Sequence, residues 1–154
     1  MKLVKFALIG LILFLSGIAN AQDHDNSSKI DEMHSLKWQT LATEAHLTPK
    51  DIEVVQPVFM EYEKSMWNMH KQNHDFFKSA LKNAKKVTPN YADLNDRYVE
   101  NLFKEAQMFR SYHLQLRKLL SPETLFKYYK AEREYKRKLL QEYQEHRSQE
   151  KQKQ

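Results

Sequence analysis

The chain has 154 residues, a formal net charge of +5, no cysteine and only two glycines. Without cysteine it forms no disulfides, so its stability has to come from the packing of secondary structure or from association. Both glycines precede residue 18, and the remainder therefore lacks the residue that the tight turns of β-hairpins favour, which argues against strands.

The first 21 residues have the features of an export signal. Lys2 and Lys5 precede an apolar run over residues 6–18, and Ala19-Asn20-Ala21 has the small-x-small pattern of a cleavage site. The run is shorter than the roughly 20 apolar residues of a membrane span, so we predict cleavage after Ala21 and a periplasmic location rather than an uncleaved anchor. Cleavage leaves about 130 residues, enough for one modest core. It also removes two positive charges, and an exported chain of mild charge is not expected to bind nucleic acid.

Residues 22–28 are polar and are predicted to form a flexible lead. A first helix is predicted over about residues 29–46, with Asp31 and Glu32 in its first turn, where acidic residues are favoured. Its apolar face consists of Ile30, Met33, Trp38, Leu41, Ala42 and Ala45.

The second helix, over residues 49–82, has the clearest start signal in the chain. Thr48 is a good N-cap residue, Pro49 suits the first helical position, and Asp51 follows in the first turn. Pro57 removes one backbone hydrogen bond, so a kink or a break is expected there. The positions spaced by threes and fours that should form its packing seam are Ile52, Val55, Phe59, Tyr62, Met66, Met69, Asn73, Phe76 and Ala80.

The same helix carries a second stripe of four residues spaced by sevens: Met60, Trp67, His74 and Leu81. At about 100° per residue, this stripe points roughly 130° away from the seam, so the two cannot enter one groove. Either another helix or a second copy covers the stripe, or it is an exposed apolar surface for a partner or client.

A third helix over about residues 91–119 has Thr88 or Asn90 as its candidate N-cap. A fourth, over about residues 122–144, begins with Ser121 as cap and Pro122 at the first helical position. Residues 145–154 contain no apolar side chain and are predicted to be disordered. The third helix should pack through Tyr91, Leu94, Tyr98, Leu102, Ala106, Phe109, His113, Leu116 and Leu120, and the fourth through Leu125, Tyr128, Tyr129, Glu132, Tyr135, Leu139 and Tyr143.

The predicted fold class is all-α: an elongated four-helix, hairpin-like architecture with two long helices in a single domain over residues 29–144. A helix of 30 residues is roughly 45 Å long, and long helices in few layers bury little area per residue. A homodimer is therefore expected. The inward carboxylate of Glu132 needs a partner, which we expect among Arg110, Arg117 and His113.

Two short segments resemble each other, Leu47-Thr48-Pro49-Lys50-Asp51 and Leu120-Ser121-Pro122-Glu123-Thr124. They resemble the paired LTxxQ motifs of Spy/CpxP-type periplasmic stress proteins, with Asp51 and Thr124 where the motif has glutamine. Residues 58–63 and 125–140 are more similar to the subgroup described as sensors of ECF-type sigma factors. The resemblance implies a helical hairpin dimer in which the motif caps helices, through Leu47, Thr48, Asp51, Leu120 and Ser121. It further implies ATP-independent chaperoning, control of a membrane-bound signalling protein, or heavy-metal sensing.

No catalytic constellation is present, so the chain is not predicted to be an enzyme. His70 and His74 are four residues apart on one helix face and could hold a divalent metal, with Asp75 or Glu63 as further ligands, or they are simply exposed histidines. The leading function is therefore binding of unfolded clients or of a signalling protein in the envelope stress response. The alternative is a periplasmic heavy-metal sensor, and a third possibility is a purely structural interaction module.

Overall fold

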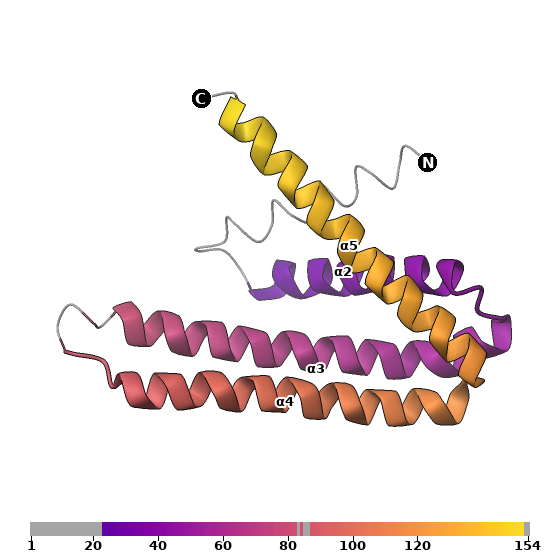
Figure 1. Cartoon of the computed structure of the whole chain (residues 1–154), viewed down its shortest axis with the longest axis horizontal. Helices are drawn as coiled ribbons and strands as arrows, with labels where there is room; N and C mark the ends of the chain where they lie inside the picture. Colours follow the sequence, from indigo (N-terminus) through magenta and orange to yellow (C-terminus); the bar gives the residue numbers. More distant parts are fainter. Residues whose placement is uncertain (1–22, 83, 85–86, 153–154) are drawn as a thin grey trace. The chain divides into compact units, whose positions relative to one another are not determined.

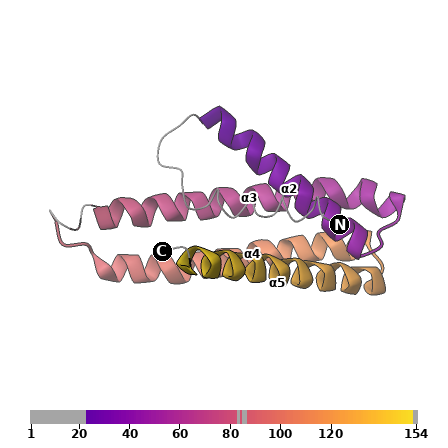
Figure 2. The same cartoon turned by 90° about the horizontal axis from the view of Figure 1, so that it is seen from above.

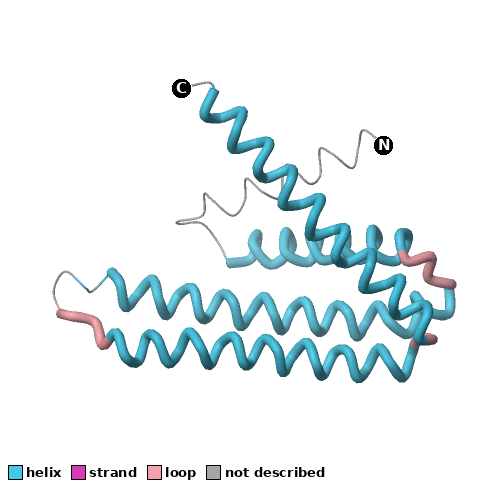
Figure 3. The backbone as a smooth tube through the Cα atoms, in the orientation of Figure 1, coloured by secondary structure: helices cyan, strands magenta, loops and turns pink. Residues whose placement is uncertain are grey.

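The computed structural model describes residues 23–82, 84 and 87–152. Four long helices account for nearly all of these residues: α2 (Asp23–Glu44), α3 (Pro49–Lys82), α4 (Tyr91–Leu119) and α5 (Pro122–Gln152). No strand occurs in this part of the chain, and Figure 3 shows loops only at the short connections between helices. The all-α prediction is confirmed. The predicted export signal lies outside the described residues.

The helices form two compact units, α2 with α5 and α3 with α4, where the sequence predicts one domain. α3 and α4 pack along their length, whereas α2 and α5 cross at an angle and meet through the second half of α2 and the first half of α5 (Figure 1). α2 begins at Asp23, inside the predicted flexible lead, and α5 continues to Gln152, through most of the predicted disordered tail.

The predicted starts of the second, third and fourth helices agree with the structure. α3 and α5 begin at Pro49 and Pro122, where the missing proline N–H costs no hydrogen bond. The side chain of Asn90 caps α4 by accepting a hydrogen bond from the Asp93 backbone N–H. Pro57 lies inside α3, which is continuous from Pro49 to Lys82, so no break occurs there.

α2 ends in a glycine-type cap that contains no glycine. His46 has a φ of 54°, in the left-handed region, and its N–H donates to the Thr43 carbonyl. The N–H of Leu47 donates to the Ala42 carbonyl, and the Leu47 side chain is buried. This is the Schellman pattern, in which glycine usually holds the left-handed position.

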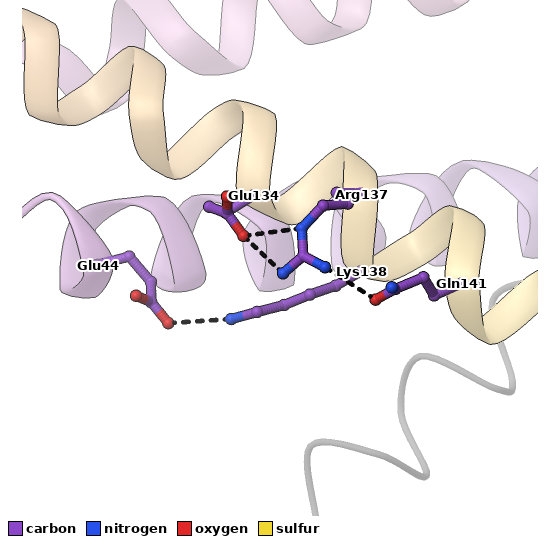
Figure 4. A network of polar contacts seen from close by, with 5 residues as sticks. All are labelled: Glu44, Glu134, Arg137, Lys138 and Gln141. Atoms are coloured by element: carbon purple, nitrogen blue, oxygen red, sulfur yellow. Dashed lines mark hydrogen bonds and ion pairs between the residues drawn. The ribbon is translucent and has the colours of Figure 1, made fainter.

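In the α2–α5 unit, the predicted apolar face of α2 is confirmed over its second half, where Trp38, Leu41, Ala42 and Ala45 are buried. The buried side chains of α5 all belong to its first half: Leu125, Tyr128, Ala131, Glu132 and Tyr135. At the surface, Lys138 pairs with Glu44 across the helices at 3.4 Å, and Arg137 pairs with Glu134 at 2.8 Å (Figure 4). These exposed pairs contribute little stability.

The predicted partners of Glu132 are wrong. Glu132 is 7% exposed, and its carboxylate lies 3.2 Å from Lys136 Nζ and 4.0 Å from Lys37 Nζ. The lysines come from α5 itself and from α2, because α5 packs on α2 and the expected partners on α4 belong to the other unit.

Candidate functional site

α3 and α4 run antiparallel and lie side by side along their whole length in both views (Figures 1 and 2). Three contacts define how α4 faces α3. Tyr112 stacks on Tyr62 with ring centroids 4.2 Å apart. The Arg97 guanidinium lies 4.6 Å from the centre of the Phe76 ring. Glu105 Oε1 lies 3.5 Å from His70 Nδ1. The spacing of Arg97, Glu105 and Tyr112 along α4 fits one helix face.

This α3-facing surface is not the one that the sequence predicts for α4. Asn101, which falls on the same face one turn from Arg97 and from Glu105, is buried to 7% exposure. The predicted middle of the seam points outward instead, with Tyr98, Leu102 and Phe109 exposed to 60%, 49% and 42%. Only the C-terminal end of the prediction holds, because Leu116 and Leu120 are buried. α4 thus buries polar groups and exposes apolar ones.

The buried polar groups are imperfectly satisfied. Arg97 Nε is inaccessible and has no hydrogen-bond partner among the residues that the structure describes. A buried donor without a partner costs free energy, and the cation–π contact with Phe76 offsets only part of it. The apolar periodicity of the sequence contains no sign of this arrangement, although Arg97, Asn101 and Glu105 are themselves spaced as a helix face.

The His70–Glu105 contact marks one side of the α3–α4 pair. Trp67 and His74 lie one helical turn before and after His70, and Leu102 and Phe109 lie one turn before and after Glu105. Since residues three or four apart share a helix face, these side chains surround the contact. The same face continues one or two turns further along each helix, to Met60 and Leu81 of α3 and to Tyr98 of α4. We call this surface the apolar side. It comprises Met60, Trp67, His74 and Leu81 of α3 and Tyr98, Leu102 and Phe109 of α4.

The predicted stripe of α3 therefore lies on the apolar side, but it is unevenly covered. Met60 and Trp67 are half-buried, whereas His74 and Leu81 are exposed. α4 supplies the larger exposed apolar area, which the periodicity of the sequence assigns to the interior of the helix pair.

The opposite side of the pair holds an open groove of about 370 Å³. Tyr62 and Met69 of α3 and Met108 and Tyr112 of α4 line it, with Lys104 among the polar side chains that also contribute. The helix pair thus has two distinct surfaces, since the groove residues lie across it from the His70–Glu105 contact.

The predicted metal pair is exposed, and each histidine lies beside an acid. His70 Nδ1 faces Glu105, and His74 Nδ1 lies 3.3 Å from Asp75 Oδ1. In the described part of the chain no cluster of three or more histidine, cysteine, aspartate or glutamate side chains is placed to hold a metal ion. Of the predicted further ligands, Asp75 contacts His74, whereas Glu105, which contacts His70, was not predicted.

The motif residues lie at the two helix junctions. The leucines of the two similar segments, Leu47 and Leu120, are both buried, and each donates its backbone N–H to the last turn of the preceding helix. Thr48 and Ser121 then stand directly before the first residues of α3 and α5. Each segment thus lies where one helix ends and the next begins, which is a structural role.

None of the described helices combines the length and the hydropathy that crossing a membrane requires. Comparison of the chain with protein-family models found no match, and comparisons with curated proteins and with solved structures found none either.

Proposed function

We propose that this chain is an exported protein of the envelope stress response that binds unfolded polypeptides on the apolar side of the α3–α4 pair. The observation that carries the proposal is the exposure of Tyr98, Leu102 and Phe109 on one face, beside Trp67. A contiguous surface of large apolar side chains on a soluble helix pair is costly unless a partner covers it.

The form of this surface favours extended, varied clients over one small ligand. It follows the length of two helices, and its ion pairs, His70 with Glu105 and His74 with Asp75, both involve a histidine. Met60 adds a side chain that adapts its shape to different partners. The N-terminal segment and the LTxxQ-like motifs support an exported, periplasmic protein of this class.

The same surface suits a second mode of action in the same response. Instead of many clients, it would bind one membrane-bound protein of an ECF sigma and anti-sigma system, as the resemblance implies. In either mode the chain acts as a hairpin-like, elongated homodimer without catalysis.

The client-binding mode is tested by light scattering of a chemically reduced protein that aggregates once its disulfides are broken. We expect the wild-type chain to suppress aggregation at a several-fold molar excess, without ATP. No suppression under these conditions contradicts client binding and leaves the signalling mode, which predicts a stable complex with one envelope protein after cross-linking in cells.

A second candidate function is heavy-metal sensing by His70 and His74. One contact favours it: Glu105 of the neighbouring helix lies 3.5 Å from His70, so the two side chains would supply one oxygen and one nitrogen ligand to a divalent ion. Calorimetric titration with zinc, copper, cobalt and nickel tests it. Sensing predicts binding that weakens at least tenfold in a His70→Ala/His74→Ala variant, and equal binding by both proteins contradicts it.

A further inference from the structure

We infer that the outer face of α4 is a self-complementary surface on which a second copy of this chain packs antiparallel. The face consists of Asp96, Val99, Phe103, Ala106 and Arg110, whose spacing of three and four residues aligns them along the helix. We call it the outer strip. It is separate from the apolar side and does not depend on client binding.

The outer strip points away from α3. At about 100° per residue, its centre lies roughly 180° around α4 from Arg97, Glu105 and Tyr112, the residues that contact α3. Phe103 and Val99 are accordingly 65% and 62% exposed, more than the aromatic and aliphatic residues of the apolar side. Exposed side chains of this size at the centre of a straight strip are typical of a helix–helix interface.

The charges at the two ends of the strip favour a second copy of the chain as the partner and set its antiparallel orientation. Asp96 and Arg110 each lie seven residues, or two turns, from Phe103, one on either side. Neither makes an ion pair with any residue that the structure describes. A two-fold axis at Phe103 brings Asp96 of each copy beside Arg110 of the other, whereas parallel packing would join like charges.

The apolar area fits a modest dimer. A large side chain has about 150–250 Å² of surface and alanine has less, so the exposed parts of Val99, Phe103 and Ala106 add up to roughly 300 Å² per copy. A standard interface buries about 800 Å² per partner, of which somewhat over half is apolar. We therefore expect a dimer that forms at micromolar concentration and dissociates on dilution.

Charge exchange tests the interface. We would measure Asp96→Arg and Arg110→Asp, separately and as an equimolar mixture, by sedimentation velocity over roughly a hundredfold range of protein concentration. Each variant alone places like charges together, so its dimer affinity should fall at least tenfold. In the mixture, a strip with two basic ends meets a strip with two acidic ends. Opposite charges then face each other at both ends, so the mixture should recover dimers that neither variant forms alone.

Glu61→Arg is the matched control for Asp96→Arg, because it also replaces an acid with arginine, at an exposed position of α3 that lines the groove. It should leave the dimer unchanged. Circular dichroism checks that all variants keep their helix content. A wild-type chain that stays monomeric at the highest concentration, as it would if another part of the chain covers the strip, overturns the inference. So does a mixture that fails to restore the dimer.

Discussion

Tyr62 and Tyr112 stack nearly face to face between α3 and α4, with ring planes 3° apart and centroids separated by 4.2 Å. Tyr112 is 3% exposed, whereas Tyr98, a member of the predicted seam earlier in the same helix, is 60% exposed. The stack therefore fixes which face of α4 is inside, and it does so with a residue that the predicted seam leaves out.

Alanine substitutions of Tyr112 and of Tyr98 test which face of α4 is buried against α3. Tyr112→Ala removes a buried ring and its stacking partner's contacts, so it should lower the free energy of unfolding by about 3 kcal/mol. Tyr98→Ala should change it by less than about 0.5 kcal/mol, because that ring is exposed. Urea denaturation measures both. Equal losses would mean that α4 packs on α3 through the seam predicted from periodicity.

The glycine-free cap of α2 offers a stabilising substitution. His46 holds a φ of 54°, which is unfavourable for a residue with a Cβ atom, so His46→Gly should raise the free energy of unfolding by about 0.5–1 kcal/mol. His46→Ala keeps the unfavourable geometry and should give no gain. The urea midpoint reports the difference, and a lower midpoint for the glycine variant would contradict the left-handed geometry.

The carboxylate of Glu132 and the ammonium of Lys37 are both mostly shielded from water, with side chains 10% and 14% exposed. Glu132→Leu leaves the Lys37 ammonium poorly solvated and should cost about 1–3 kcal/mol, whereas Lys37→Met should cost less, because Lys136 still lies 3.2 Å from Glu132. The double variant should lose less than the sum of the two, because it leaves neither charge behind. Additive losses in urea denaturation would show that the two groups do not interact.

The phenol of Tyr129 makes the stability of the folded chain depend on pH. Burial, assisted by the negative charge of Glu132, raises the pKa of Tyr129 to about 12. Because the folded state holds this proton more tightly than the unfolded chain, whose tyrosines titrate near about 10, the contribution to stability is complete below about pH 10. It is lost progressively as the pH rises toward about 12. Thermal unfolding at several alkaline pH values should show this loss in wild type and a smaller loss in Tyr129→Phe. An identical pH dependence of the two proteins would contradict the assignment.

Local chemistry made the helix starts predictable. Thr48-Pro49 and Ser121-Pro122 mark the first turns of α3 and α5, and those signals depend only on residues next to one another. The apolar face of α2 was also predictable, since Trp38 and Leu41 are buried where periodicity places them.

The rotation of α4 and the ion pair of Glu132 were not predictable in the same way. Periodicity locates an apolar face on a helix, but it does not say whether a neighbouring helix, a second copy or a client covers that face. In α4 the neighbouring helix covers Arg97 and Asn101 instead. The partners of Glu132 depended on which helix packs on α5, and that is a property of the tertiary structure.

Binding of unfolded chains by the apolar side is tested most directly by comparing Tyr98→Asp with Ser111→Asp in the aggregation assay. Both put one negative charge at an exposed position of α4, the first on the apolar side and the second in the groove. We expect Ser111→Asp to suppress light scattering as well as wild type does, and Tyr98→Asp to require several-fold more protein for the same effect. Equal suppression by all three proteins would contradict the proposed site.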